Sequence, residues 1–307
     1  MSFVFGPVSS RRFGLSLGID LSPDRKRCNY DCLYCELSKA KPIAVFDEPA
    51  DWREIASEVK EALKTCSPDK LTITANGEPT LYPYLNALID ELNAIKNGAK
   101  LMILSNGATI GVPSVTAALA KLDIVKLSLD AAEEKAFKKV DRPRSSFANL
   151  GAVINGMINF RARYMGELVI ETLLVGGAND TADNFNALAL ALNKIRPDRI
   201  DIGTIERPSA YKVQAASAEN MRLLADRLAA IGLNARIIPS KYINAKCSFD
   251  RIALLALLQR RSLSDFEAAA ILDETALALL SDLVSEGLAT IKTLGEKRFY
   301  AKADLSA

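Results

Sequence analysis

Three of the five cysteines lie close together, at Cys28, Cys32 and Cys35, in the spacing C-x3-C-x2-C. Random placement would give this arrangement in roughly one chain in a thousand. Structural zinc and iron–sulfur sites are normally closed by four protein ligands. A cubane cluster held by only three thiolates keeps one iron open for a ligand from outside the protein, which a catalytic site requires. The spacing therefore predicts a catalytic iron–sulfur centre.

The two remaining cysteines, Cys66 and Cys247, leave simpler interpretations open. Either could complete a four-ligand zinc site with the triad, or the clustered thiols could be reduced surface groups. We expect neither outlying cysteine to be a ligand. Cys66 falls on the apolar face of an expected helix, which favours a core thiol. Cys247 is expected to be an inert thiol.

The absence of histidine restricts the chemistry further. It excludes Ser-His-Asp and Cys-His catalysis, His-ligated zinc and His-ligated haem. The net charge of +2 is too small to indicate a nucleic acid or an anionic membrane as partner. No apolar run approaches the roughly 18 residues of a membrane span, and the N-terminus lacks the features of an export signal. The protein is therefore predicted to be cytoplasmic, without a membrane partner.

Short polar motifs follow several of the expected strands. One is Asn76-Gly77-Glu78-Pro79-Thr80, and Ser105-Asn106-Gly107 follows the next strand. Ser128 and Asp130 are two residues apart, so both side chains would face the same side of a strand. Each motif alone could be a turn or a helix cap. Because parallel α/β sheets carry their active sites at the carboxyl ends of the strands, these loops are expected to carry the chemistry.

The elements that must position these residues alternate between strands and helices from about residue 14 to residue 240. One helix is expected to begin with Asp51 as its N-cap, and another to end at Asn97-Gly98. This alternation predicts an α/β fold with a mostly parallel sheet, either doubly wound or curled into a barrel. The expected strands are Leu15–Leu21, Leu71–Thr74, Lys100–Leu104, Ile124–Leu129, Leu168–Val175, Arg199–Ile205 and Ala235–Ile238.

The pattern changes after about residue 247. Arg251–Arg261, Leu263–Leu272 and Glu274–Gly287 are predicted helices, and Ile291–Lys302 is a predicted hairpin that turns at Gly295. Three helices and a hairpin suggest a winged helix-turn-helix module. Its expected recognition helix, Glu274–Gly287, carries carboxylates and no Lys or Arg, so duplex DNA is an unfavourable partner. Docking of a protein or peptide, or closure of one end of the barrel, is favoured, while contact of the basic hairpin with RNA stays open.

The segment Cys28–Cys35, with Tyr34 just before its last cysteine, resembles the cluster loop of the radical S-adenosylmethionine (SAM) superfamily. The resemblance implies a 4Fe-4S cluster, ligated by the three cysteines, whose free iron binds the amino and carboxylate groups of SAM. It also implies the reaction. An electron from the cluster cleaves SAM to methionine and a 5′-deoxyadenosyl radical, which abstracts a hydrogen atom from the substrate. Tyr34 would lie near the adenine.

The strand-end motifs resemble further superfamily motifs in the right order. Asn76-Gly77-Glu78-Pro79 is similar to the GGEP motif that holds the amino group of SAM, with Asn76 in place of the first glycine. Ser105-Asn106-Gly107 resembles the TNG turn. Ser128 and Asp130 resemble the SLD motif, which contacts the ribose or the methionine carboxylate. The resemblance thus implies contacts with SAM for these residues and for Glu171 in the following strand.

The resemblance covers about residues 5 to 240 and implies a partial (β/α)6 barrel. We therefore expect two domains, a radical SAM barrel in residues 1–246 and a winged helix-turn-helix module in residues 247–307. The segments Gly6–Gly14, Glu171–Gly177 and Glu206–Pro208 also resemble one subgroup, the iron–sulfur oxidoreductases related to wybutosine-synthesising tRNA enzymes. The expected protein is an enzyme of the oxidoreductase or transferase type.

The superfamily resemblance also implies partners. A low-potential electron donor of the flavodoxin or ferredoxin type would reduce the cluster. The substrate stays open between an RNA and a peptide or protein. The alternative class is an iron–sulfur redox sensor with a winged-helix output domain. The acidic helix and the cofactor-like motifs at the strand ends count against that alternative.

Anaerobic reconstitution is expected to load about four irons and four sulfides per chain. Cys28→Ala, Cys32→Ala and Cys35→Ala should each abolish the cluster, because each removes one of only three ligands. Iron content and visible absorbance measure the result. Cys66→Ala and Cys247→Ala serve as controls and should retain the cluster. Loss of the cluster in either control would overturn the three-ligand assignment.

Overall fold

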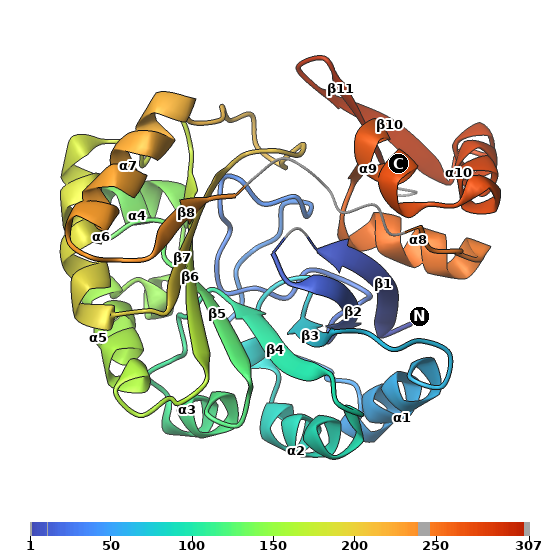
Figure 1. Cartoon of the computed structure of the whole chain (residues 1–307), viewed down its shortest axis with the longest axis horizontal. Helices are drawn as coiled ribbons and strands as arrows, with labels where there is room; N and C mark the ends of the chain where they lie inside the picture. The colour runs from blue at the N-terminus through green and yellow to red at the C-terminus, as the bar shows by residue number, and fades with distance from the viewer. Residues whose placement is uncertain (1, 11, 239–245, 304–307) are drawn as a thin grey trace.

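The computed structural model describes residues 2–10, 12–238 and 246–303 (Figure 1). Arg11, which belongs to the Gly6–Gly14 motif, lies outside the described residues. Eight strands form one sheet in the order of the chain, with β2 to β8 parallel and β1 antiparallel to β2 at one edge. The strands are β1 Val4–Ser10, β2 Gly14–Asp20, β3 Lys70–Thr74, β4 Lys100–Ser105, β5 Ile124–Ser128, β6 Glu167–Leu174, β7 Arg199–Thr204 and β8 Ala235–Ile237.

Helices α1 to α7 cover the outer face of this curved sheet (Figure 1). They are α1 Trp52–Ala62, α2 Leu85–Ile95, α3 Pro113–Leu119, α4 Glu134–Val140, α5 Leu150–Arg161, α6 Ala182–Ile195 and α7 Ala218–Ala230. Short 3-10 turns lie at Pro79–Leu81 and Ser145–Phe147. Asp51 caps α1 as predicted, accepting a hydrogen bond from the Arg53 N–H at 2.9 Å. No helix in the described part of the chain is long and apolar enough to cross a membrane.

The two faces of the sheet have different residues, because successive side chains of a strand point to opposite sides. Leucine and isoleucine side chains of β2 to β6 are buried in one cluster with apolar residues of the helices. Each such side chain contributes about 2 kcal/mol by leaving water. The residues between them face the inside of the curve, where many are polar or charged: Ser16, Asp20, Thr72, Thr74, Lys126 and Glu171. The outer face therefore stabilises the fold, and the inner face is available for a site.

The predicted α/β fold with a mostly parallel sheet is confirmed. Six strand–helix units, from β2 and α1 to β7 and α7, are followed by β8, in agreement with a partial barrel. The expected strands all occur, with ends that differ by at most one residue. Strand β1 was not predicted. Gly6 and Pro7 interrupt its alternation, and its register with β2 shifts between Phe5 and Val8.

The C-terminal module, residues 246–303, has its own core and its own small sheet, in the order β10-β11-β9. Its elements are α8 Arg251–Arg260, β9 Leu263–Ser264, α9 Asp265–Ile271, α10 Glu274–Ser285, β10 Ala289–Leu294 and β11 Lys297–Lys302. The helix predicted from Leu263 starts two residues later, because Leu263 and Ser264 pair with β11 and Ser264 caps α9. The assignment of this module as a winged helix stays a prediction.

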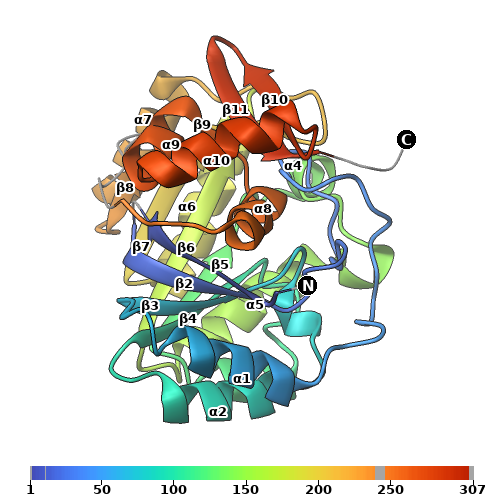
Figure 2. The same cartoon turned by 90° about the vertical axis from the view of Figure 1, so that its right-hand side faces the viewer.

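The C-terminal module packs against strand β1, on the opposite side of the sheet from α1 and α2 (Figure 2). Val8 is buried in the core of the module, and Phe5 packs against it. Arg260 donates from Nε to Oδ2 of Asp20 at 2.8 Å, and both side chains are almost fully buried. Oδ1 of Asp20 accepts from the Asn76 N–H at 2.9 Å. One buried ion pair thus joins the module to the ends of β2 and β3.

Arg260→Ala is expected to lower the free energy of unfolding by on the order of 3 kcal/mol, because it leaves the Asp20 carboxylate buried without a cation. Urea unfolding at neutral pH measures the change. The exposed Arg53→Ala is the control and should have little effect. Arg260→Met combined with Asp20→Asn should recover part of the loss. If Arg260→Ala behaved like the control, the pair would not anchor the module.

Candidate functional site

The three clustered cysteines lie in a long loop, residues 21–51, between β2 and α1; we call it the cysteine loop. The loop has no helix or strand of its own and is held by the strand ends beside it. Arg27 bridges to Gly77: the Arg27 N–H donates to the Asn76 carbonyl at 2.7 Å, and the Glu78 N–H donates to the Arg27 carbonyl at 2.8 Å. A Cβ atom at Gly77 would lie 1.8 Å from the Arg27 carbonyl oxygen, so this close approach requires glycine.

Other backbone bonds hold the far side of the cysteine loop. The Leu33 N–H donates to the Val140 carbonyl at the end of α4 at 2.8 Å, and the Arg144 N–H donates to the Asn29 carbonyl at 2.9 Å. After β7, the Ala210 N–H donates to the Cys35 carbonyl at 2.8 Å. The loop is therefore fixed from three directions by segments far away in the sequence.

The cysteine thiols line one pocket of about 230 Å³, which we call the cysteine pocket. Ten of the twelve predicted site residues line it, whereas Asn76 and Asp130 do not. The ten come from the cysteine loop and from the ends of β3, β4, β5 and β6. They are Cys28, Cys32, Tyr34, Cys35, Gly77, Glu78, Ser105, Asn106, Ser128 and Glu171. The structure therefore brings together residues that are spread over nearly half of the sequence.

The three cysteines of the triad are half-buried, and their thiols interact electrostatically with one another. Burial raises the pKa of Cys28 to about 12, and the Glu78 carboxylate raises it further. Burial also raises the pKa of Cys32, with added repulsion from Asp141 and the neighbouring cysteines. Three mutually repelling thiolates need a cationic core to remain charged together, and a cluster of iron ions supplies one. The donor set fits a three-thiolate cluster.

The zinc alternative finds no support in this geometry. Within the described ranges, no three His, Cys, Asp or Glu side chains converge on a single-ion site. Thiolates of a cubane bind different irons, so they need not converge on one point. Cys66 donates to the Ala62 carbonyl at 3.2 Å beside the barrel core, and Cys247 pairs through its backbone with Leu272. Neither lines the cysteine pocket.

Glu78 is almost fully buried, and its carboxylate ties the segment after β3 to the end of β4. Oε1 accepts from the Thr80 N–H at 3.0 Å and from the Ser105 hydroxyl at 2.7 Å, while Oε2 accepts from the Asn106 N–H at 2.7 Å. Burial raises the pKa of Glu78, and these hydrogen bonds oppose the rise. Most of its acceptor capacity is thus used inside the protein. The geometry gives Glu78 a positioning role that the sequence motif did not suggest.

Asn106 connects the end of β4 to the cysteine loop. Its Nδ2 donates to Oδ1 of Asn29 at 2.7 Å and lies 3.9 Å from Sγ of Cys28. Oδ1 of Asn106 accepts from the Ala108 N–H at 3.0 Å, which fixes the turn after the strand. Asn106 therefore holds the cysteine loop, and it lines the cysteine pocket together with Ser105.

Asp130 lies behind the pocket wall and supports Tyr34. The Tyr34 hydroxyl donates to Oδ2 of Asp130, and the Leu173 N–H donates to Oδ1 at 2.7 Å. Burial raises the pKa of Asp130 to about 6, and the two hydrogen bonds limit the rise. Strand β5 ends at Ser128, so Asp130 lies two residues beyond the strand rather than within it. Ser128 lines the cysteine pocket, and Asp130 orients the aromatic ring.

Glu171 forms ion pairs with Lys126 and Arg12 in the wall of the cysteine pocket. Its neighbour in the register of β5 and β6 is Ser128. Burial opposes the charge, but Lys126 and Arg12 lower the pKa of Glu171 to about 2. Lys126 is itself buried, which lowers its pKa, while the Glu171 carboxylate opposes that change. The three side chains form one fixed group of charges on the inner face of the sheet.

Two lysines of the site were not among the predicted site residues. Lys126 interrupts the apolar run Ile124–Leu127 two residues before Ser128, and a lysine inside a buried strand was a usable signal. Lys26 lines the cysteine pocket and contacts Asp31 at 3.4 Å. Burial would lower the pKa of Lys26, but the Cys35 and Cys28 thiols raise it above its ordinary value. No pattern in the sequence distinguished it from its basic neighbours.

The fold and the site define a class: a parallel α/β half-barrel with a three-cysteine pocket at the carboxyl ends of its strands. A family model described as the Radical SAM superfamily matches residues 25–192. The chain belongs to this superfamily. The match includes the cysteine loop and strands β3 to β6, which form the pocket.

Similar proteins support the assignment. A UPF0026 protein of Helicobacter pylori is 45% identical over 98% of this chain and 97% of its own length. A protein of Flammeovirga pacifica, named S-adenosylmethionine-dependent nucleotide dehydratase, is 26% identical over 56% of this chain and 57% of its own length. Among solved structures, a radical SAM methyltransferase from Sphaerobacter thermophilus has a TM-score of 0.53, with 14% identity over 72% of this chain and 66% of that chain. This last likeness shows the fold alone.

The charges around Glu171 predict a pH dependence of stability. Its pKa in the folded protein, about 2, lies below the ordinary value of 4.5. The ionised carboxylate therefore stabilises the fold fully above pH 4.5, and this contribution is lost as the pH falls toward 2. Glu171→Gln should lower the free energy of unfolding at neutral pH by on the order of 3 kcal/mol, because Lys126 loses its partner.

Urea unfolding of the cluster-free protein at a series of pH values tests this expectation. The difference between wild type and Glu171→Gln should shrink as the pH falls below 4.5. Glu61→Gln removes an exposed carboxylate of a surface pair and is the matched control. A difference that stayed constant down to acidic pH would show that the charge of Glu171 is not its source.

Proposed function

We propose that this protein is a radical SAM enzyme that binds a 4Fe-4S cluster through Cys28, Cys32 and Cys35. The observation that carries the proposal is the single pocket that contains these thiols and the strand-end residues. When bound, the cluster supplies the electron that cleaves SAM to methionine and the 5′-deoxyadenosyl radical, which abstracts a hydrogen atom from the substrate. The finer subgroup, related to wybutosine-synthesising enzymes, stays a prediction.

The residues of the cysteine pocket divide the binding of SAM among them. The edge of backbone at Asn76 and Gly77, held under the cysteine loop, offers carbonyl acceptors for the amino group. Ser128 offers a hydroxyl to the ribose or to the methionine carboxylate, and Tyr34 places its ring near the adenine. Glu78 and Asp130 act through other residues, since their carboxylates hold Ser105, Asn106 and Tyr34 in place.

In this proposal Glu171 contacts SAM, and the cations beside it keep its carboxylate ionised. The paired carboxylate lines the cysteine pocket and can accept hydrogen bonds from SAM. Arg12 and Lys126 keep it ionised at neutral pH, so its charge does not depend on binding.

A low-potential donor of the flavodoxin or ferredoxin type would approach the cysteine loop, where Lys39 and Arg142 stack on Tyr211.

We propose that the C-terminal module closes the substrate side of the barrel rather than reading DNA. Leu280 and Leu283 of α10 are buried in the core of the module, and Leu277, Val284 and Leu288 pack around them. The remaining side of α10 carries carboxylates, which an anionic duplex would repel. The surface of the module that can close the barrel is therefore the one that meets β1 and the cysteine loop.

The central experiment is cleavage of SAM by the dithionite-reduced, cluster-loaded protein. It should produce 5′-deoxyadenosine slowly even without substrate, as measured by chromatography. Cys32→Ala should produce none, because no cluster forms. A cluster-loaded protein that made no 5′-deoxyadenosine under any reducing condition would contradict the proposal, and the redox-sensor alternative would then lead.

Glu78→Gln tests the positioning role of Glu78. The variant should retain the cluster but bind SAM at least about tenfold more weakly, because the amide cannot accept from Thr80, Ser105 and Asn106 at once. Equilibrium binding of SAM to the reconstituted protein measures the change. Glu61→Gln is the surface control. Unchanged SAM affinity in Glu78→Gln would remove Glu78 from the cofactor site.

A further inference from the structure

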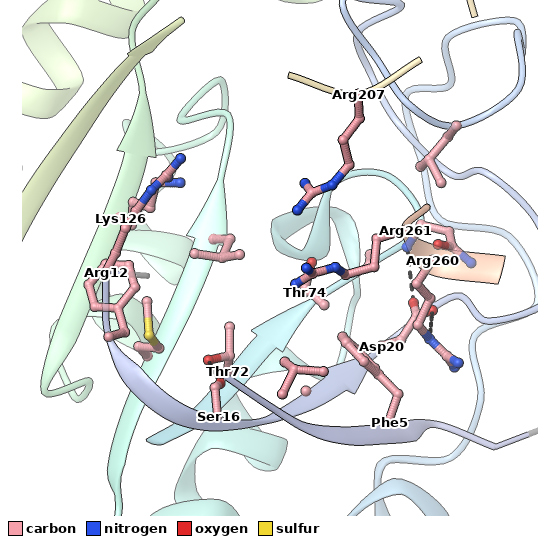
Figure 3. A pocket seen from close by; sticks show the side chains of 18 residues that line it. Phe5, Arg12, Ser16, Asp20, Thr72, Thr74, Lys126, Arg207, Arg260 and Arg261 are labelled. Atoms are coloured by element: carbon pink, nitrogen blue, oxygen red, sulfur yellow. Dashed lines mark hydrogen bonds and ion pairs between the residues drawn. The ribbon is translucent and has the colours of Figure 1, made fainter. Parts of the chain in front are cut away.

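A second cavity adjoins the cysteine pocket inside the curve of the sheet (Figure 3). It has a volume of about 330 Å³, and we call it the barrel pocket. The two pockets share Leu37, Thr74, Leu104 and Lys126 in their walls. A molecule in the barrel pocket would therefore lie beside the place where SAM is cleaved in the proposed function.

The wall of the barrel pocket is strongly cationic. Of the described residues that line it, five carry a positive charge: Arg12, Lys126, Arg207, Arg260 and Arg261. One carries a negative charge, Asp20, and this carboxylate pairs with Arg260 at the edge of the pocket. Concave sites lined by one sign of charge concentrate ligands of the opposite sign, so this wall favours an anion.

The cations lie on two facing walls (Figure 3). Arg207, from the segment after β7, and Arg261, from the C-terminal module, extend toward the middle of the pocket. Arg12, from the turn between β1 and β2, and Lys126, from β5, lie on the opposite wall. Ser16, Thr72 and Thr74 line the floor between them with hydroxyl groups. An anion between the walls would meet donors on both sides.

Carboxylates behind the walls hold these cations in place. Glu267, which is fully buried in α9, pairs with both Arg207 and Arg261. Arg207 also contacts Glu36 at 3.1 Å. Glu171 pairs with Arg12 and Lys126 across the sheet. Glu267 and Glu171 do not line the barrel pocket, so the charge presented to its interior is positive. Paired side chains are also oriented in advance, which reduces the entropy lost on binding.

Phosphate matches this arrangement better than a carboxylate does. A phosphate ester carries a charge of about −1.5 to −2 and three acceptor oxygens. Its charge calls for more than one cation, whereas one cation neutralises a carboxylate. The planar fork of arginine suits the oxygen atoms of phosphate, and the arginines here outnumber the lysine.

A wider cleft leads from the barrel pocket to the surface, and cations line it too. It measures about 610 Å³ and shares Leu37, Asn76, Arg260 and Arg261 with the barrel pocket. Lys26 and Lys39 of the cysteine loop line one part of it, and Lys292 and Lys302 of the C-terminal module also line it. Further phosphates of an extended ligand would find cations along this route.

We propose that the barrel pocket binds the phosphate group of a phosphorylated substrate, with Arg207 and Arg261 as its anchors. This inference rests on the proposed function, because it places the substrate beside the SAM site. It gives the C-terminal module a direct part in substrate binding through Arg261. Two sources share the chemistry: a free nucleotide, and a phosphate in a single strand of RNA.

Calorimetric titration of the cluster-loaded protein in the presence of SAM tests the proposal. The probes are inorganic pyrophosphate, uridine 5′-monophosphate and a short oligouridylate. At least one should bind, and Arg207→Lys and Arg261→Lys should each weaken its binding about tenfold or more, because lysine keeps the charge but not the two-pronged contact. Lys64→Gln is the control. Lys64 is exposed just after α1 and pairs with Glu61, so its replacement should change the affinity less than about twofold.

The probes distinguish the two sources. Binding of pyrophosphate or the mononucleotide supports a free nucleotide, and binding of oligouridylate alone supports an RNA strand. Because Arg261→Lys could disturb Glu267, Arg261→Gln combined with Glu267→Gln removes both charges together and should also weaken binding. Thermal unfolding verifies that each variant is folded.

The proposal is overturned if no phosphate probe binds, or if the arginine variants bind it as the wild type does. Preferential binding of an oligoglutamate peptide would also overturn it, in favour of an acidic polypeptide. Formation of 5′-deoxyadenosine is measured on the same samples. A protein that cleaves SAM but binds no phosphate refutes this inference alone, whereas one that binds phosphate without cleaving SAM refutes the proposed function.

Discussion

The close approach of the Arg27 backbone to Gly77 is the contact on which the candidate site depends. The cysteine loop has no regular secondary structure, so its position must come from bonds to other segments. Two backbone hydrogen bonds to the end of β3 supply that position, and they form only because residue 77 has no side chain. Glu78 then ties the same strand end to Ser105 and Asn106. Loss of this contact would separate the thiols from the residues that share their pocket.

The difference between the two faces of the sheet determines where charged residues can lie. Apolar residues on the outer face bind the helices and leave the inner face free to carry charges such as Lys126, Glu171 and Asp20. Buried charges are tolerated only in pairs or networks. In this protein Glu171, Glu267 and Asp20 each pair with at least one cation whose side chain lines a pocket. The same ion pairs therefore stabilise the fold and orient the cations.

The strands and the cysteine site were predictable because both depend on short-range patterns. Runs such as Leu71–Thr74 reveal a buried strand, and the spacing of Cys28, Cys32 and Cys35 indicates a shared ligand. The partners of Glu78 and Asp130 were not predictable, because their carboxylates bond to groups far away in the sequence. The role of Lys126 likewise depends on the neighbouring strand, where the structure places Glu171. Sequence patterns indicated which residues belong to the site, and three-dimensional contacts assign what each one does.

The buried pair of Arg260 and Asp20 has a consequence for how the two parts of the chain depend on each other. Asp20 accepts from the Asn76 N–H, and the Asn76 carbonyl accepts from the Arg27 N–H next to Cys28. A chain of hydrogen bonds thus runs from helix α8 to Arg27, the residue before the first cysteine. Thermodynamic linkage then applies in both directions. Linkage therefore predicts that whatever tightens the seating of the C-terminal module also rigidifies the cysteine loop, and that loading of the proposed cluster in turn favours the seated module.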